Sequence, residues 1–388
     1  MTESIHIKNF GPINDICLDD IRRFTVLIGE SGSGKSVLMK VLVLFRWIFK
    51  RYNLHEYLRR RGEDGYWLPE TLEEVLPNTG LNPFVRSESE ITYTVSFATL
   101  GEEHTLRFHW RTGQALGIEG SVPPEALTYL KLSYIAETRG FIPFALYKPQ
   151  MLRGADFGFF FHEVLNEFGE SNESVKRLEL PYLNVNYRVE KRGLVTEHHV
   201  TGRTSDYDIE LKHASSGIQN IVPLLSIVKM YADYFDPAVA LRKALPKNIS
   251  ELGIAENQFS HRVDLHIEEP ELGLSPAAQC DLMNALVRQC FVENVINLGV
   301  VMATHSPFFL TQINNMLQAG QVHERDANAP LPIPPLRNDS TAVYQIADGE
   351  CVSLLDIETG LIGDNAIDTC SEEVYAQFDT LLNLEYHD

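Results

Sequence analysis

The residues best suited to chemistry form a glycine-rich turn near the N-terminus, where residues 29, 34, 35 and 36 match the spacing G-x-x-x-x-G-K-S. Glycines let the backbone direct its N–H groups at phosphate oxygens, and a following helix N-terminus adds partial positive charge. We expect Lys35 to reach the β- and γ-phosphates and the Ser36 hydroxyl to bind Mg²⁺. An apolar strand pattern before the turn and a helical pattern after it favour this interpretation over a chance glycine-rich turn. The predicted phosphate-binding residues are Gly29, Glu30, Ser31, Gly32, Ser33, Gly34, Lys35 and Ser36.

A pair of adjacent carboxylates forms the second candidate site. Glu268 and Glu269 end an apolar strand pattern that begins at Val263, and Pro270 and Glu271 follow them. Adjacent carboxylates at a strand end repel each other unless a cation lies nearby, which favours a functional site over an exposed acidic turn. We predict that Glu268 holds Mg²⁺ through water and that Glu269 orients and polarises an attacking water.

Two shorter motifs accompany the carboxylates. Residues 215–219 precede a long apolar helical pattern that runs from Ile221 to Tyr234, and by themselves they need be no more than a helix N-cap. Residues 304–307, which include His305, end a buried strand pattern at 297–303. A lone histidine after a strand is usually structural. His305, however, comes at the end of the strand that follows the acidic strand, where a residue that contacts the γ-phosphate would be needed.

The remaining pattern predicts the elements that must position these motifs. Alternation at 91–97 and 105–110 indicates an antiparallel hairpin, and alternation within 182–211 indicates further hairpin strands. A strand is expected at 130–136, and a surface loop at 319–340. The other expected elements are strands at 4–8, 16–18 and 25–28, helices at 36–52, 276–290 and 371–384, an aromatic-rich and partly helical segment at 141–180, and a hairpin at 342–346 and 351–355.

Charge limits the kinds of partner that the surface can attract. The chain has 388 residues and a net charge of −20, so its surface repels nucleic acid unless a local basic patch exists. The densest basic cluster lies within residues 46–61. It indicates either contact with nucleic acid or an acidic partner, or a solvated face paired with neighbouring acids, and the second is the commoner use of a charge run. The basic residues are Arg46, Lys50, Arg51, Arg59, Arg60 and Arg61, and the neighbouring acids are Glu56, Glu63 and Asp64.

Cysteine content and hydropathy predict a cytoplasmic protein. The five cysteines are scattered without a C-x-x-C pair, which suits a reducing compartment and argues against a zinc site or a disulfide framework. The N-terminus shows no charged-then-apolar signal pattern. The most apolar stretch, residues 37–49, contains Lys40 and Arg46 and is too short to span a bilayer.

Taken in order, the four motifs resemble those of an ABC-type ATPase head. Residues 29–36, 215–219, 267–271 and 304–307 stand in the order of the phosphate loop, signature, Walker B and histidine motifs of this AAA-family group, which includes OLD, RecF and SMC proteins. The acidic strand end followed by Thr304-His305-Ser306-Pro307 is most similar to stand-alone heads of bacterial OLD-like ATPases. Among these are the ATPase subunits of anti-phage defence systems such as PARIS, Septu and some retrons.

The resemblance implies a single α/β head over residues 1–388. The expected fold is a P-loop ABC-type ATPase head with a mixed sheet, an antiparallel β subdomain and a helical insert. Residues 1–135 would form the first part of the nucleotide-binding lobe with the β subdomain, and residues 141–180 the helical insert. Residues 182–388 would carry the signature motif, the Walker B strand, the histidine loop and a C-terminal hairpin and helix.

The resemblance also implies hydrolysis of ATP to ADP and phosphate, with Mg²⁺, in a homodimer or a larger ring. ATP would lie between the phosphate loop of one copy and the signature motif of another, so that Ser216 and Gly217 bind the γ-phosphate in trans. Ser215 belongs to the same motif, and Gln219 ends it with an expected structural role. The expected catalytic residues are Glu269 and His305.

Several positions depart from the family pattern. Ser31 stands where many relatives have asparagine, and Glu268 replaces the commoner aspartate. The glutamine that usually contacts Mg²⁺ and the attacking water has two candidates here, Gln114 and Gln150. Glu137-Thr138-Arg139 resembles an Ala-Glu-Arg-type motif of these relatives.

Three functions agree with these features. The sequence shows no long heptad repeat, no zinc-hook cysteines and no C-terminal nuclease motif, which implies a separate partner that carries the output. The first hypothesis is therefore a regulatory ATPase of a bacterial anti-phage defence system, which controls an effector such as a nuclease or toxin; nucleic acid is possible but not required. The second is a RecF-like DNA-repair ATPase that acts directly on DNA. The third is an ATP-binding scaffold with little turnover.

Overall fold

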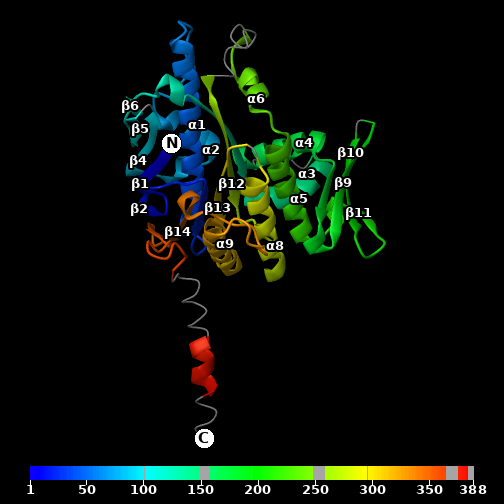
Figure 1. Cartoon of the computed structure of the whole chain (residues 1–388). Coiled ribbons are helices and arrows are strands. Elements are labelled where there is room, and N and C mark those ends of the chain that lie inside the picture. Colours follow the sequence, from blue (N-terminus) through cyan, green and yellow to red (C-terminus); the bar gives the residue numbers. More distant parts are fainter. Residues whose placement is uncertain are drawn as a thin grey trace.

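A six-stranded sheet lies at the centre of the computed structural model (Figure 1). Its order is β15-β14-β3-β13-β12-β7, and all neighbours from β14 to β7 pair in parallel, whereas β15 is antiparallel. The strands are β3 (Phe24–Ile28), β7 (Thr128–Ile135), β12 (Ser260–Glu268), β13 (Leu298–Thr304), β14 (Thr341–Ala347) and β15 (Glu350–Ser353). The structure describes residues 1–99, 101–148, 150, 157–193, 195–247, 258–294, 296–363 and 375–382.

The two faces of this sheet carry different layers. Leu27 and Val301 pack in one apolar cluster with helix α1, whereas Val26 and Met302 pack in another with α4, α5, α8 and α9. Because successive strand side chains point to opposite faces, this alternation places the two sets of helices on opposite sides. Burial on both faces explains why β3 and β13, which are buried at every position, are predominantly apolar. The helices are α1 (Lys35–Arg59), α4 (Phe159–Ser174), α5 (Ser216–Lys229), α8 (Pro276–Val287) and α9 (Pro307–Arg325).

Two antiparallel sheets flank this core. The first, ordered β2-β1-β4-β5-β6, packs against α1, and the second, ordered β11-β10-β9-β8, forms the right-hand edge of Figure 1. Their strands are β1 (Thr2–Phe10), β2 (Ile13–Leu18), β4 (Val85–Thr99), β5 (Glu102–Arg111), β6 (Gly117–Gly120), β8 (Arg177–Leu180), β9 (Val185–Arg192), β10 (Val195–Gly202) and β11 (Asp208–Glu210). Shorter helices are α2 (Leu76–Thr79), α3 (Ile142–Tyr147) and α6 (Pro237–Ala244). Among the described helices, none has the length and apolar character needed to cross a bilayer.

The predicted α/β fold class is confirmed: the central sheet is mixed, and an antiparallel β subdomain flanks it. The predicted helical insert at 141–180 contains α3 and α4, but it ends in strand β8. Of the closing helix predicted at 371–384, residues 375–382 are helical and mostly exposed, and the remainder lies outside the described residues.

Two predicted boundaries are wrong. Helix α1 continues beyond residue 52 to Arg59, because Leu54 and Leu58 extend its buried face. The predicted surface loop at 319–340 begins as helix, since α9 continues to Arg325. Gly320 permits this arrangement because a Cβ there would collide with the carbonyl oxygen of Leu336.

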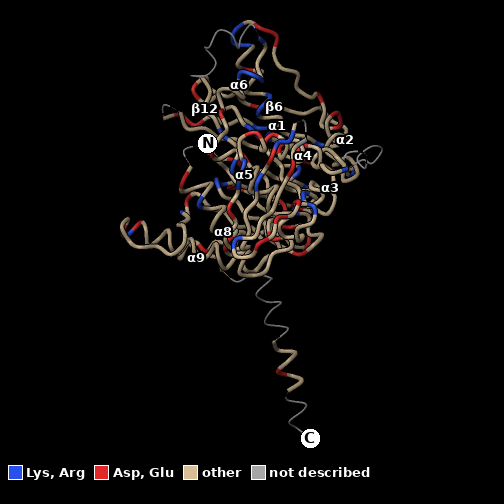
Figure 2. The backbone as a smooth tube through the Cα atoms, turned by 90° about the vertical axis from the view of Figure 1, so that its right-hand side faces the viewer, with Lys and Arg blue, Asp and Glu red and all other residues tan. Residues whose placement is uncertain are grey.

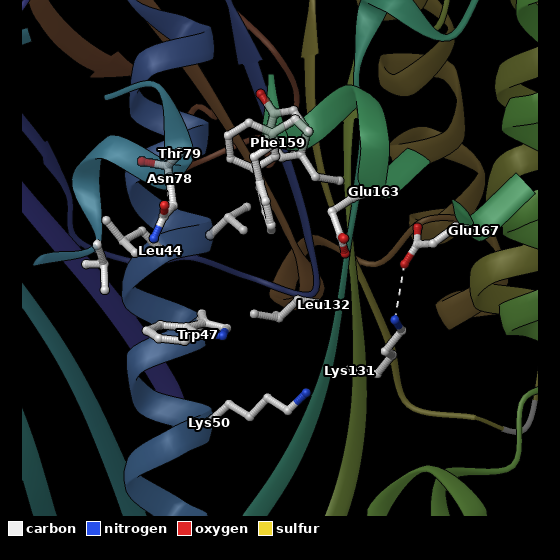
Figure 3. Close-up of a pocket in the computed structure, with 14 residues that line it drawn as sticks. Leu44, Trp47, Lys50, Asn78, Thr79, Lys131, Leu132, Phe159, Glu163 and Glu167 are labelled. Atoms are coloured by element: carbon white, nitrogen blue, oxygen red, sulfur yellow. Dashed lines mark ion pairs between the residues drawn. The ribbon is translucent and has the colours of Figure 1, made fainter. Parts of the chain in front are cut away.

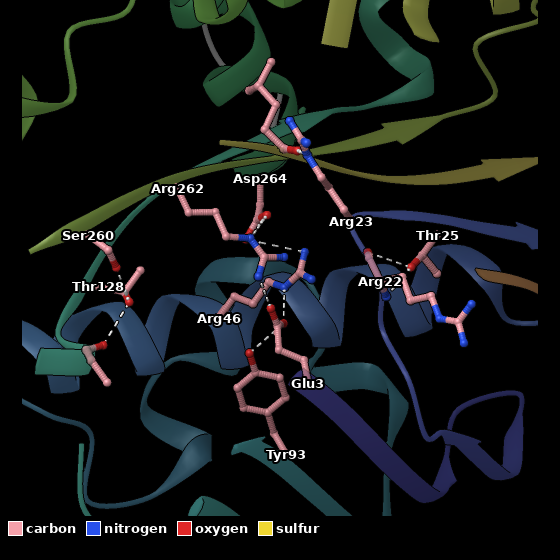
Figure 4. A network of polar contacts seen from close by, with 12 residues as sticks. Glu3, Arg22, Arg23, Thr25, Arg46, Tyr93, Thr128, Ser260, Arg262 and Asp264 are labelled. Atoms are coloured by element: carbon pink, nitrogen blue, oxygen red, sulfur yellow. Dashed lines mark hydrogen bonds and ion pairs between the residues drawn. The ribbon is translucent and has the colours of Figure 1, made fainter. Parts of the chain in front are cut away.

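Buried charged side chains join three parts of the fold (Figure 4). Glu3 of β1 accepts hydrogen bonds from Arg46 of α1 at 2.8 Å and from Arg262 of β12 at 2.5 Å. The Tyr93 hydroxyl of β4 donates to Glu3 at 2.9 Å, and Arg262 donates to Asp264 at 2.6 Å. Glu3, Arg46 and Asp264 are almost fully buried, so each charge depends on these partners. The network therefore connects the antiparallel sheet to the helix after the glycine-rich loop and to the strand that carries the paired carboxylates.

Glu3→Gln is expected to lower the free energy of unfolding at pH 7 by about 3 kcal/mol, because two buried guanidinium groups lose their carboxylate. Burial opposes ionisation of Glu3, but the charges of Arg262 and Arg46 outweigh it and lower its pKa to about 2. A folded-state pKa below the unfolded value of 4.5 means that this stabilisation is complete above that pH and is lost as the pH falls toward 2. Urea unfolding between pH 2.5 and 7 measures the effect.

The control is Asp15→Asn, which removes an exposed carboxylate paired with His6 and Lys8 on the same antiparallel sheet. An exposed ion pair contributes about 1 kcal/mol or less, so this variant should remain close to the parent. Equal losses in the two variants would contradict a stabilising role for the buried network.

Candidate functional site

Four strand ends meet at one edge of the central sheet. Ile28 at the end of β3 lies opposite Thr304 at the end of β13. Glu268 at the end of β12 lies opposite Ala303 of β13, and β7 runs parallel beside β12. The segments that leave these strands therefore lie along the carboxyl edge, where α/β sheets bind ligands. They contain the glycine-rich loop, His305, Glu269 and Glu137.

The glycine-rich loop holds its lysine against its own backbone. Gly34 has a φ of 106°, which other residues rarely adopt, and α1 begins at the next residue. The Lys35 ammonium donates to the carbonyl oxygens of Gly29 at 2.9 Å and Glu30 at 2.7 Å. Burial lowers the pKa of Lys35 to about 8, although nearby carboxylates oppose the shift. A desolvated ammonium beside the free N–H groups of a helix N-terminus favours binding of phosphate.

Glu268 has the surroundings of a metal ligand. Glu268 is 1% exposed. Within the described part of the chain, neither of its carboxylate oxygens has a hydrogen-bond partner. Burial disfavours its ionisation, but contacts with Glu137 and the charge of Lys40 outweigh burial and lower its pKa. The Ser36 hydroxyl also lies close to this carboxylate. A buried anion with orphaned oxygens beside a hydroxyl fits a hard cation such as Mg²⁺, which Ser36 and Glu268 would hold.

Glu137 is a site residue that the sequence analysis did not assign. Contact with the carboxylate of Glu268, together with burial, raises the pKa of Glu137 to about 7. Two carboxylates in contact cannot both ionise at neutral pH without a cation between them. The two glutamines considered for this edge are exposed, and Gln114 lies in the turn after β5 of the antiparallel sheet. The only signal in the sequence was the Glu137-Thr138-Arg139 motif after a strand.

Glu269 and His305 face each other at this edge, with His305 Nε2 3.3 Å from Glu269 Oε1. Glu269 has a φ of 41°, a conformation that costs a non-glycine residue about 1–3 kcal/mol and is common at functional sites. Glu271 accepts hydrogen bonds from the Thr304 hydroxyl at 2.8 Å and the His305 N–H at 2.7 Å. The acidic turn and the histidine loop are therefore held together.

The buried guanidinium of Arg139 binds the backbone of the turn that contains Glu269. It donates to the carbonyl oxygens of Glu268 and Glu269, each at 2.6 Å. It also donates to the carbonyl oxygen of Asn220 in α5, at 3.2 Å. Burial lowers the pKa of Arg139 to about 10, although nearby carboxylates oppose the shift. One side chain therefore connects the backbone of Glu269 to the helix that begins at the predicted signature motif.

The predicted signature residues lie at the start of α5. Ser215 and Ser216 are exposed, and within the described ranges no hydrogen bond or ion pair links them to the glycine-rich loop of their own chain. Gly217 is buried against Gly273, where an added Cβ would come within 2.5 Å of the carbonyl oxygen. The side chain of Gln219 donates to two carbonyl groups of the preceding turn, as expected for a structural residue. The two serine hydroxyls are therefore available at a helix N-terminus, a position that favours anions.

Comparison with known proteins finds likeness in structure only. No family model matches the chain, and no curated protein matches it. An SMC head bound to the C-winged helix domain of ScpA has a TM-score of 0.44 and 10% identity, over 93% of this chain and 99% of that chain. An SMC head domain from Thermotoga maritima has a TM-score of 0.36 and 13% identity, over 91% of this chain and 97% of that chain. The recombination mediator protein RecF with ATPrS, from the RecFOR pathway, has a TM-score of 0.38 and 9% identity, over 91% of this chain and 98% of that chain. At such low TM-scores, functional conclusions depend on the geometry of the site.

Arg139→Met is expected to reduce nucleotide turnover at least tenfold while leaving the affinity for nucleotide within about threefold. The glycine-rich loop is unchanged, but the backbone of Glu269 loses the donor that fixes it. Several buried carbonyl groups also lose a partner, so the free energy of unfolding should fall by about 3 kcal/mol. Steady-state kinetics, nucleotide titration and urea unfolding measure the three quantities.

Arg337→Met provides the matched control, because Arg337 is exposed and pairs only with Asp339 among the described contacts. It should leave all three quantities close to those of the parent. Unchanged turnover in a folded Arg139→Met protein would contradict the positioning role.

Proposed function

We propose that this protein binds ATP with Mg²⁺ and hydrolyses it to ADP and phosphate. One observation carries the proposal: a phosphate-type loop, a buried carboxylate with orphaned oxygens and a strained glutamate beside a histidine share one sheet edge. These are the parts that phosphoryl transfer to water requires, namely charge neutralisation, a metal ligand and a group that orients water.

Each residue at the edge has a separate part in the proposed reaction. The N–H groups of the loop and the Lys35 ammonium would bind the β- and γ-phosphates. Ser36 and Glu268 would hold Mg²⁺, which neutralises phosphate charge when it is bound. Glu269 would orient and polarise a water for in-line attack on the γ-phosphorus. His305, 3.3 Å from the Glu269 carboxylate, would contact the γ-phosphate.

We also propose that the active form is a homodimer or a larger ring with nucleotide at the contact. The exposed hydroxyls of Ser215 and Ser216 support this arrangement, because they lie at a helix N-terminus without a link to the loop of their own chain. They would contact the γ-phosphate held by Lys35 of another copy. The close approach of Gly217 to Gly273 would connect that contact to the turn beside Glu269.

Glu269→Gln is expected to lower the turnover number at least 100-fold, the usual range for loss of a general base, and to leave ATP affinity nearly unchanged. It should also accumulate the ATP-bound assembly, which light scattering after size-exclusion chromatography detects. Lys35→Ala should abolish ATP binding, because the loop loses its cation. Turnover is followed by phosphate release and binding by calorimetry.

Glu293→Gln is the control for Glu269→Gln, since Glu293 is an exposed carboxylate outside the sheet edge. Full turnover by Glu269→Gln would refute the catalytic assignment. Tight ATP binding with negligible turnover by the parent protein would favour the scaffold hypothesis.

We propose in addition that the ATPase is a switch in a bacterial anti-phage defence system and acts on a separate effector. The support is the resemblance of the Glu268-Glu269-Pro270-Glu271 and Thr304–Pro307 motifs to those of OLD-like defence ATPases. ATP binding would assemble the heads, and the assembly would hold or release a toxic partner such as a nuclease.

Affinity purification of Glu269→Gln from the native host, with ATP present, should recover a stoichiometric effector protein, identified by mass spectrometry. Lys35→Ala serves as the control, since a partner that depends on ATP-driven assembly should be lost from it. Recovery of DNA without a protein partner would contradict the switch and favour the repair hypothesis.

Direct binding of DNA has less support from side-chain contacts. Arg59 and Arg60 lie 3.2 Å and 3.8 Å from Glu56, and Arg61 donates to Gln258 at 2.9 Å. Figure 2 shows acidic and basic residues interspersed along the chain. These contacts agree with the favoured interpretation of a paired face for Arg59, Arg60 and Arg61. That interpretation is wrong for Arg46, which is buried and pairs with Glu3.

A further inference from the structure

A cavity separate from the nucleotide edge lies between α1, β7 and α4 (Figure 3). Its volume is about 360 Å³, which is within the range of pockets that bind small organic molecules. Leu44 and Trp47 line it from α1, Leu132 from β7 and Phe159 from α4. These apolar side chains form a surface against which a planar, apolar part of a ligand could pack.

One end of this cavity carries a cation, Lys50, for which the described residues supply no anionic partner. The Lys50 side chain projects from α1 toward the cavity and toward Lys131 (Figure 3). Lys131 pairs with Glu167 at 3.2 Å, whereas within the described residues Lys50 has only the Tyr129 ring, whose centroid lies 4.9 Å from its ammonium. Burial, together with the neighbouring positive charge of Lys131, lowers the pKa of Lys50 to about 8. The Lys50 end therefore has an excess of positive charge.

The acidic residues of the cavity do not neutralise Lys50. Glu167 is buried, and besides Lys131 it accepts hydrogen bonds from the hydroxyls of Ser133 and Tyr231. Glu163 also lines the cavity, and no ion pair joins it to Lys50 among the described residues (Figure 3). A partly desolvated ammonium without a counter-ion is costly, and a bound anion would remove that cost.

We propose that this cavity binds a small organic anion with a flat apolar body. A carboxylate or phosphate group would pair with Lys50, and an aromatic or planar body would lie along Trp47 and Leu44. Such a ligand would both neutralise the Lys50 ammonium and pack against the apolar side chains of the cavity. A neutral analogue would only pack against the apolar side chains, and a cation would be repelled by Lys50.

The cavity is also connected to the nucleotide edge. Tyr134 and Phe160 line the cavity, and the Lys40 ammonium lies 6.0 Å and 5.5 Å from their ring centroids. Tyr134 and Lys40 in turn act on the carboxylate of Glu268. A ligand that moves these rings would change the affinity for nucleotide, and nucleotide would change its affinity by the same factor. This consequence, unlike binding itself, depends on the proposed function.

The test is a matched pair of probes, 2-naphthoate and its neutral amide 2-naphthamide, titrated calorimetrically into the full chain without nucleotide. Naphthoate should bind at least tenfold more tightly than naphthamide, because only naphthoate carries the charge. Lys50→Met should abolish this preference, and Lys50→Arg should retain it. Lys191→Met, at an exposed lysine paired with Glu173, should behave as the parent does. Urea unfolding confirms that each variant is folded.

Equal affinity for the two probes, absence of binding by both, or a preference that survives in Lys50→Met would each overturn the proposal. Because these titrations contain no nucleotide, their outcome is independent of whether the protein hydrolyses ATP. Repeating them with ATP and Mg²⁺ tests only the coupling between the two sites.

Discussion

Parallel pairing of β7, β12, β13 and β3 is the constraint on which the candidate site depends. Parallel strands in register end at the same edge, so residues from four distant parts of the chain reach one place. The glycine-rich loop, the acidic turn, His305 and Glu137 are neighbours for this reason. Any change that shifts one strand along the sheet would separate the groups proposed to bind phosphate from those proposed to orient water.

Buried charge maintains this alignment from two sides. At one side, Glu3 and its arginine partners connect α1 to β12, so the helix that follows the phosphate loop cannot move independently of the strand that carries Glu268. At the other side, Arg139 binds the backbone of the acidic turn and of α5. Arg139 suits this role because its planar guanidinium presents several donors in a fixed geometry. Desolvation makes both arrangements costly to break, since each leaves unpaired charge or orphaned carbonyls in the interior.

The cavity beside Lys50 and the proposed nucleotide edge share two structural elements. Both are built on α1 and β7, and Tyr134 contacts the surroundings of each. A single helix therefore carries the proposed phosphate-binding groups at its N-terminus and, further along, a lysine without a counter-ion among the described residues. Because the two sites share packed side chains, binding of a small ligand in the cavity could change the affinity for nucleotide at the edge.

Local sequence patterns were enough to predict the local features of this protein. The spacing of Gly29, Gly34, Lys35 and Ser36 predicted the loop, and strict alternation predicted the antiparallel hairpins, because both depend on neighbouring residues alone. The extent of α1 and α9 was underestimated, since it depends on packing partners such as Leu336 that lie outside each segment. The folded structure alone places Glu137 against Glu268 and Arg139 against the turn of Glu269, and it alone leaves Lys50 without a counter-ion among the described residues. Each of these is a contact between distant segments, and no local pattern records which strand lies beside which or what charge a folded neighbour supplies.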